Sequence, residues 1–383
     1  MAMSRRAAMA GGALAMAGVA ARPLLAAPDG RAAALDAAAK AAIDAHACPC
    51  VQVAVGERGA MTASRGYGLA NIETGTPVSP QSVFRIASLT KQFTAATAIA
   101  LSARGMLALD APVSRHLPFM AKLKPVTALE LMHQTAGLKS DESIASPAAD
   151  ASGVKTQVRL AQAIAEQPAP FDFDPGTAWL YSNANYILLG GLIEAAAGKP
   201  LAEVMAEILF RPLGLTRTAL DHAEDVVPGR ASGYTPTGDN ARPFANAAYI
   251  PIVEAGGAGA MRSTAEDLCR WHDALLGGRL LDAKHLDLML APGRLRDGRL
   301  SGANRLRKED DAAYGDMQYA CGLLVSPPGD PRPLITHYGG INGFGSLLET
   351  RTDTRTTIAA LCNGDMGPDL PFRAIRRAVW PVS

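Results

Sequence analysis

The sequence SLTKQFTAATAIAL occupies residues 88–101, and the interpretation of the whole chain starts from it. Its apolar positions recur at helical spacing, at Leu89, Phe93, Ala96 and Ala100, and Gly105 follows as a natural C-cap. We therefore predict a largely apolar, buried helix that begins at Ser88.

The first turn of this helix carries a hydroxyl and an amine on one face. Ser88 and Lys91 are three residues apart, so their side chains are neighbours. Burial lowers the pKa of a lysine, which allows a neutral amine to accept the serine proton. We interpret Ser88 as a nucleophile, with an ordinary N-cap serine as the alternative. A second Ser-x-x-Lys, at Ser152 to Lys155, lies among small polar residues and is the weaker candidate.

Tyr181-Ser182-Asn183 is the second candidate motif, and it precedes a predicted helix over 186–197. A tyrosine near an ammonium can relay a proton, and an asparagine can donate to a substrate carbonyl. The alternative is that Tyr181 is a packed aromatic residue and Asn183 a helix cap. The motif alone does not decide between these two interpretations.

The third motif, His337-Tyr338-Gly339, ends an apolar run and is followed by Gly340. Glycine lets a substrate lie close to the backbone, and a free strand N–H can stabilise an oxyanion. The alternative is a strand-end histidine before a glycine turn. The three motifs together supply what acyl transfer through a serine ester needs.

With these motifs the chain resembles the serine β-lactamase and penicillin-binding-protein superfamily, in its class C-like branch, which also holds carboxypeptidases, D-aminopeptidases and esterases. The superfamily's motifs include Ser-x-x-Lys. The resemblance extends over roughly Ala33 to Trp380, and it is supported by four further segments: Phe84–Lys91, Leu131–Leu138, Pro212–Leu215 and Gly256–Thr264.

The resemblance implies a role for each motif residue. Ser88 would be acylated, Lys91 and Tyr181 would share general acid and base duty, and Asn183 would hold the substrate amide. His337 stands where β-lactamases of this branch carry a lysine, so β-lactam hydrolysis is disfavoured.

The remaining implied roles concern the end of the third motif. The N–H groups of Ser88 and Gly340 would form the oxyanion hole, with Gly339 beside the substrate. At Tyr338 the relatives usually carry threonine or serine, and a bulky residue there tilts the prediction away from a substrate with a free carboxylate.

The fold that we expect is an α/β sandwich of the β-lactamase/transpeptidase type. Strands are predicted near both ends of the chain, at 51–56, 61–69, 319–325, 334–337, 344–350 and 356–362. Helices are predicted at 32–47, 160–166, 202–208 and 371–379. One mainly antiparallel sheet would thus form a lobe from residues 28–108 and 252–383, with a helical subdomain over about 109–251 inserted.

Residues 1–27 are predicted to be an export signal, because they hold three arginines, no acidic residue and an alanine-rich stretch. Arg5-Arg6 is compatible with twin-arginine export, and a periplasmic or secreted protein is expected. Without this segment 34 basic and 36 acidic residues remain. That balance and an aromatic content of 5% do not indicate a nucleic-acid partner, and no further stretch indicates a membrane span.

The five cysteines cannot all pair. Cys48 and Cys50 flank Pro49 near His46, but a metal site there would lack a fourth ligand, and the sequence does not specify a disulfide.

We expect no cofactor and no metal, and a small-molecule or short-peptide substrate. The predicted function is hydrolysis of an ester or an amide. The substrate would be a D-amino-acid peptide, a β-lactam-like compound or a short acyl ester. The alternative is a non-hydrolytic penicillin-binding sensor on the same fold.

Overall fold

The structure is a computed structural model that describes residues 29–139, 156–367 and 370–380. The predicted export signal over 1–27 and the second Ser-x-x-Lys at Ser152 lie outside these residues. None of the described helices is long and apolar enough to span a bilayer.

The main element is one antiparallel sheet of eight strands in the order β3-β2-β1-β13-β12-β11-β10-β9. Its first strands are β1 (Cys50–Glu57), β2 (Ala60–Asn71) and β3 (Thr76–Pro77). The others are β9 (Gln318–Tyr319), β10 (Leu324–Val325), β11 (Leu334–Ile341), β12 (Phe344–Arg351) and β13 (Thr356–Cys362). Strands from both ends of the chain therefore share one sheet, as predicted.

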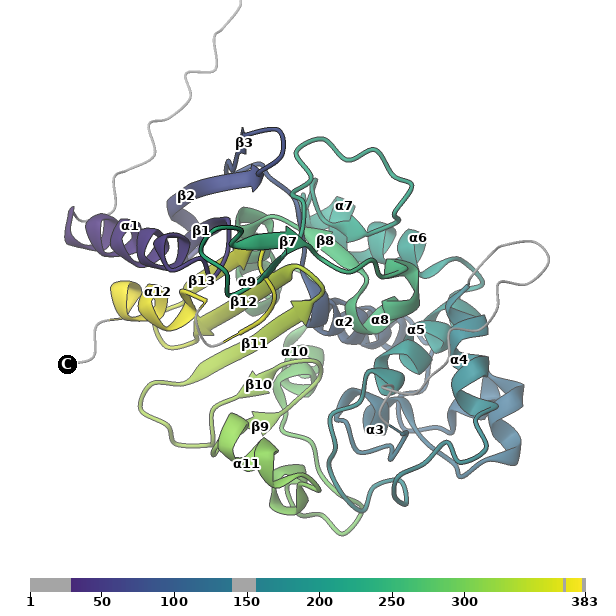
Figure 1. The fold of residues 1–383 in the computed structure, drawn as a ribbon. Helices are drawn as coiled ribbons and strands as arrows, with labels where there is room; N and C mark the ends of the chain where they lie inside the picture. The colour runs from purple at the N-terminus through teal and green to yellow at the C-terminus, as the bar shows by residue number, and fades with distance from the viewer. Residues whose placement is uncertain (1–28, 140–155, 368–369, 381–383) are drawn as a thin grey trace, which may run out of the picture.

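The two ends of the chain meet where β1 pairs with β13, from Val51 opposite Cys362 to Glu57 opposite Thr356. Every residue of β13 and the first six of β1 are buried, so these central strands are covered on both faces. Helices α1 (Asp29–Asp44) and α12 (Phe372–Val379) pack together over one face (Figure 1). Helix α9 (Ala265–Leu276) packs on β1 and β13 from the other side.

The predicted helix after Ser88 is present with one difference at its start. Ser88 lies in a 3₁₀ turn, η1 (Ala87–Leu89), and the α-helix α2 begins at Thr90 and ends at Ala103. Every residue of α2 up to Leu101 is buried. Helix α2 is therefore a buried central helix of the core, and the segment that follows Ser88 is enclosed on all sides.

Helices α3 (Ala128–Met132), α4 (Gln157–Ala165), α5 (Asn183–Ala197) and α6 (Leu201–Met205) form the part of the molecule beside α2. A π-turn over Ala206–Phe210 and α7 (Arg211–Leu213) continue α6. The division into a sheet lobe and a helical subdomain over 109–251 stays a prediction. Within that range the structure also has short strands: β5 (Ala219–Leu220), β6 (Tyr234–Pro236) and β7 (Phe244–Asn246).

Two strand predictions near the C-terminal end need correction. Residues 319–325 form two short paired strands, β9 and β10, because Gly322 has a positive φ of 78° and turns the chain between them. Strand β11 does not stop at His337 but continues to Ile341, with Gly339 and Gly340 paired to β12. The turn therefore comes at Asn342-Gly343, a usual two-residue hairpin connection.

All five cysteines are buried thiols, and none of them is paired in a disulfide. Burial raises the pKa of the Cys50 thiol well above its ordinary value. Within the described part of the chain, no three His, Cys, Asp or Glu side chains are grouped so that they could hold a metal ion.

Candidate active site

Ser88 lies where the short strand β4 (Phe84–Arg85) passes through η1 into α2. Ala87 before it has a φ of +47°, a strained conformation for a residue with a side chain. Hydrogen bonds hold this turn from two sides. Thr90 Oγ1 donates to Ala87 O at 2.6 Å, and Ser346 Oγ on β12 donates to Ile86 O at 2.9 Å. The half-buried Ser88 is thus presented on a fixed turn.

Lys91 is fully buried, and its ammonium nitrogen is held by three oxygen atoms. Nζ lies 3.1 Å from Ser88 Oγ, 2.7 Å from Asn183 Oδ1 and 2.9 Å from Ala258 O. The amide and backbone oxygens can only accept, so Lys91 must donate a proton to each. Ser88 Oγ, 3.1 Å away, can either accept from Nζ or donate to the lone pair of a neutral amine. The predicted proximity of Ser88 and Lys91 is present.

The carbonyl of Ala258 is a part of this site that the sequence analysis missed. It lies on the single helical turn α8 (Gly256–Gly259), which packs against α5. A side chain at Gly257 would place its Cβ 2.6 Å from Tyr186 O, so only glycine lets α8 approach α5 this closely. The Gly256–Thr264 segment of the sequence was the available signal, but it did not show which atom would reach Lys91.

Tyr181 and Asn183 also lie beside Lys91. The Lys91 Nζ is 4.8 Å from the centre of the Tyr181 ring, and Asn183 is the first residue of α5, after the N-cap Ser182. Gln134, which the sequence analysis did not single out, fixes this segment. Its backbone has a φ of +63°, and its side-chain oxygen accepts a hydrogen bond from Ser182 N at 3.0 Å. The segment that carries both motif residues is thus anchored to the end of α3.

His337 is buried behind Tyr181, with 6.1 Å between the two ring centres. Its Nδ1 lies 2.6 Å from Tyr338 O, which can only accept, so Nδ1 carries the proton. Nε2 then accepts from the hydroxyl of Tyr319 at 3.3 Å, a partner that the sequence analysis missed. Burial, together with the nearby Lys91, lowers the pKa of His337 to about 3. His337 is therefore a neutral imidazole, not a substitute for a lysine cation.

Tyr338 does not face Ser88, which corrects the argument that its bulk would crowd a substrate carboxylate. Its hydroxyl accepts a hydrogen bond from Arg376 Nη2 on α12 at 2.6 Å, and its ring packs near Phe372. Arg376 in turn pairs with the fully buried Glu349. Successive residues of a strand point to opposite faces, so Tyr338 belongs to the α12 face and His337 to the Ser88 face.

Gly339 lets β11 lie against the turn that carries Ser88. A Cβ at Gly339 would lie 2.4 Å from Ile86 O and 3.1 Å from Ser88 N, so any side chain would push the strand away. Gly340 is exposed and lines the same cavity as Ser88. The sequence-predicted residues on β11 therefore divide into His337 and Gly339, which are buried, and Gly340, which lines the cavity.

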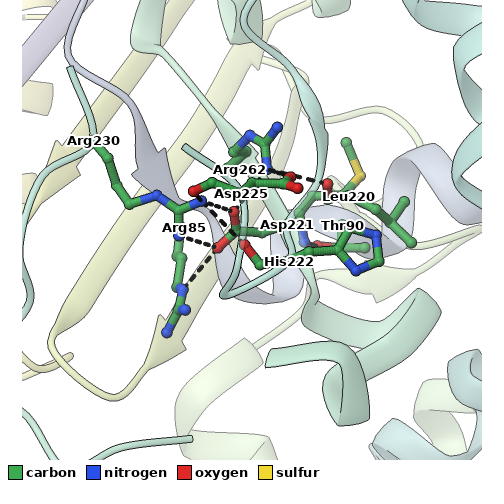
Figure 2. A network of polar contacts seen from close by, with 9 residues as sticks. Arg85, Thr90, Leu220, Asp221, His222, Asp225, Arg230 and Arg262 are labelled. Carbon is green, nitrogen blue, oxygen red and sulfur yellow. Dashed lines mark hydrogen bonds and ion pairs between the residues drawn. The ribbon is translucent and has the colours of Figure 1, made fainter. Parts of the chain in front are cut away.

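A network of charged residues holds the two strands that lead into the site (Figure 2). Asp221 has a side chain only 1% exposed, and it pairs with Arg85 on β4 at 3.0 Å and with Arg262 on β8 (Met261–Ser263) at 2.9 Å. Arg230 reaches the same carboxylate at 2.9 Å. Arg85 precedes Ser88 by three residues, and Arg262 follows Ala258 by four. Through Asp221 the network thus links the strand before Ser88 to the strand after Ala258.

The cavity beside Ser88 has a volume of about 380 Å³. Ser88, Asn183 and Gly340 line it together with aliphatic side chains from α4, α5 and β11. A concave, mainly apolar site with a few converging polar groups is the usual form of a small-molecule site. The cavity is therefore our candidate substrate cleft.

The buried histidines make stability depend on pH. Burial lowers the pKa of His272 and of His337 to about 3, against about 6.5 in an unfolded chain. Below pH 6.5 the unfolded chain binds protons that the folded chain excludes, so stability falls as the pH falls. We expect a loss of about 1.4 kcal/mol per histidine and pH unit between about 6.5 and 4.

Urea unfolding at a series of pH values measures this effect, and carboxylates contribute to the same trend. The variant His272→Gln separates the contribution of the histidine from that of the carboxylates, because glutamine does not titrate. Its unfolding free energy should fall less steeply with acid than that of the wild type. Equal slopes in the two proteins would show that His272 does not contribute.

Residues 35–379 match the family model described as Beta-lactamase. The chain therefore belongs to the β-lactamase family, which confirms the resemblance found in the sequence. The expected fold, an α/β sandwich with a mainly antiparallel sheet, and the expected enzyme class, a serine hydrolase, are confirmed with it.

Two curated relatives and one solved structure illustrate this relation. The chain is 24% identical to penicillin-binding protein 4* of Bacillus subtilis (strain 168) over 322 residues, 81% of this chain and 67% of the relative. It is 35% identical to the esterase EstB of Burkholderia gladioli over 183 residues, 44% of this chain and 46% of that protein. A D-stereospecific amidohydrolase from Streptomyces sp. has the same fold, with a TM-score of 0.73, 24% identity, and coverage of 92% of this chain and 99% of the other. The matched region spans about half of the esterase's length.

Proposed function

We propose that the protein hydrolyses an ester or amide of a small substrate through an acyl-enzyme on Ser88. The observation that carries this proposal is the position of Lys91, whose Nζ lies 3.1 Å from Ser88 Oγ and also donates to Asn183 Oδ1 and Ala258 O. A base in hydrogen-bond contact with a hydroxyl nucleophile is the arrangement that nucleophilic catalysis requires.

In the proposed reaction Ser88 Oγ attacks the substrate carbonyl carbon, and its proton passes to Lys91 or Tyr181. The carbonyl oxygen becomes an oxyanion and accepts hydrogen bonds from the N–H groups of Ser88 and Gly340. Loss of one such donor typically costs about 100- to 1,000-fold in rate. The alcohol or amine then leaves with the transferred proton, and water hydrolyses the serine ester to the acid.

Features on both sides of the cleft support these roles. Asn183 lines the cleft and can hold the substrate carbonyl or amide group. Strand β11 pairs with β10 only at Ile335 and Thr336, so in the described chain its edge at Gly340 has no neighbouring strand. The relatives named as an esterase and an amidohydrolase are consistent with both bond types.

The test is the intact mass of the purified protein after exposure to a fluorophosphonate and, separately, to a penicillin. We expect one fluorophosphonate adduct that peptide mapping places on Ser88 and that is absent from Ser88→Ala. A stable adduct without turnover of a chromogenic ester would support the sensor alternative instead. No adduct on folded protein would overturn the proposed nucleophile.

We also propose that the protein is exported. Three arginines, no acidic residue and an alanine-rich stretch in residues 1–27 support this proposal. The intact mass of protein taken from the extracytoplasmic fraction of its host would show whether the segment has been removed. Protein found only in the cytoplasm at full length would contradict export.

A further inference from the structure

We propose that a second cavity, bordered by β4 and β8, binds a small oxyanion such as phosphate or a dicarboxylate, and that Arg85 and Arg262 hold it. The inference goes beyond the proposed function, because it concerns a different cavity from the one beside Ser88. It is carried by the lining of this cavity, by an excess of positive charge, and by arginine N–H groups that have no partner in the described chain.

The second cavity has a volume of about 260 Å³. That volume is below the roughly 300–1,000 Å³ of sites for drug-sized ligands, so the cavity suits a small ligand. The polar side chains of its lining are four charged residues of the network in Figure 2, a hydroxyl and an amide: Arg85, Arg230, Arg262, Asp221, Ser232 and Asn246. The lining is thus rich in hydrogen-bond donors.

Positive charge is in excess at this cavity. Among the described lining residues Asp221 supplies the one carboxylate, and it faces three guanidinium groups at 2.9–3.0 Å. Asp225 pairs with Arg262 at 2.7 Å from outside the lining, so the described ion pairs set two carboxylates against three cations. The arginine side chains are only 17–28% exposed, so water screens the remaining charge incompletely. An anion in the cavity is therefore attracted more strongly than at a fully exposed arginine.

Two of the three arginines also have donors to spare. Arg85 donates only through Nε, to Asp221 at 3.0 Å. Arg262 donates only through Nη1, to Asp221, Asp225 and Leu220 O. Within the described chain, Nη1 and Nη2 of Arg85 and Nη2 of Arg262 thus have no protein partner, and none of them is sealed from solvent. A guanidinium with free terminal N–H groups can bind two oxygens of one carboxylate or phosphate side by side.

Support of the neighbouring strands explains only part of this arrangement. Arg230 donates to the backbone oxygens of His222 and Asp225 as well as to Asp221, as expected of a structural residue. Arg85 makes a single hydrogen bond, so most of its guanidinium is left for a ligand. We therefore assign the charge of the site to all three arginines and the direct contacts to Arg85 and Arg262.

Isothermal titration calorimetry of the purified protein at neutral pH tests the inference. Sodium phosphate, sulfate and malonate are titrated separately, each against sodium chloride of equal ionic strength. We expect one saturable site per chain for at least one of the three oxyanions and none for chloride, which has no pair of oxygens to offer a guanidinium. Phosphate and malonate distinguish a phosphate-type from a carboxylate-type ligand. No saturable binding of any oxyanion to the folded protein, or equal heats from chloride, would overturn the inference.

A pair of charge variants locates the site. Asn246 lies on β7 at the exposed rim of the cavity, so Asn246→Asp adds a negative charge there and should weaken binding about tenfold. Asn240→Asp is the matched control, because Asn240 is exposed outside this lining, and it should bind as the wild type does. Equal affinities in the two aspartate variants would show that the anion binds elsewhere.

The variant Arg85→Lys tests the direct contact. Lysine keeps the positive charge beside Asp221 but lacks the planar fork that binds two oxygens. We expect about tenfold weaker oxyanion binding, and urea unfolding in an anion-free buffer shows whether the variant is folded. Wild-type affinity in folded Arg85→Lys would contradict the role of Arg85.

Discussion

Replacement of Lys91 by methionine is expected to lower kcat/KM for a chromogenic ester by about 10²- to 10⁴-fold, the contribution typical of a positioned general base. Methionine fills the buried volume of the lysine stem but cannot take a proton from Ser88. It also leaves Asn183 Oδ1 and Ala258 O without the donor that now lies 2.7 and 2.9 Å away. Ester hydrolysis and the rate of fluorophosphonate labelling of Ser88 measure the loss.

Two further variants show what Lys91 contributes. Lys91→Arg keeps a cation but cannot act as a base, because a guanidinium stays protonated. If Lys91 acts as a base, arginine should be nearly as inactive as methionine; if it only supplies charge, arginine should retain activity. Lys40→Met is the control, since Lys40 is an exposed lysine on α1 that pairs with Asp44. Labelling of folded Lys91→Met within tenfold of wild type would contradict the proposed role.

The parts of the site that could be predicted from the sequence are those set by local spacing. Ser88 and Lys91 are three residues apart in one helical segment, so their contact follows from helix geometry once the helix is recognised. The residues that were missed depend on packing between distant segments. Ala258 reaches Lys91 only because Gly257 allows α8 to lie against α5, and Gln134 reaches Ser182 across 48 residues.

The error at Tyr338 has a specific cause. The expectation at Tyr338 came from the resemblance, in which this position usually holds a threonine or serine beside the substrate, while the strand itself was predicted only as far as His337. In the structure β11 continues to Ile341, and the alternation of a strand then sends Tyr338 to the α12 face. Glycine in a strand can mark a close approach of another backbone and not only a turn. At Gly339 that neighbouring backbone is the turn that carries Ser88.

Replacement of Asp221 by asparagine should destabilise the fold by about 3 kcal/mol, the lower end of the range for a broken buried ion pair. The carboxylate is 1% exposed and faces Arg85, Arg230 and Arg262, so its loss leaves three guanidinium groups close together (Figure 2). The lower end applies because the three arginine side chains keep 17–28% exposure to water. Urea unfolding at neutral pH measures the change.

A second substitution tests whether charge is the reason for that loss. Adding Arg230→Gln to Asp221→Asn removes one of the unpaired cations, so the double variant should be more stable than Asp221→Asn alone. Asp297→Asn is the exposed control: its pair with Arg299 has side chains 50–59% exposed, and its loss should cost much less than the loss of Asp221. Since Arg85 and Arg262 flank the turns that present Ser88 and Ala258, folded Asp221→Asn should also label more slowly at Ser88. A free energy of unfolding within 1 kcal/mol of wild type would show that the network does not hold these two strands together.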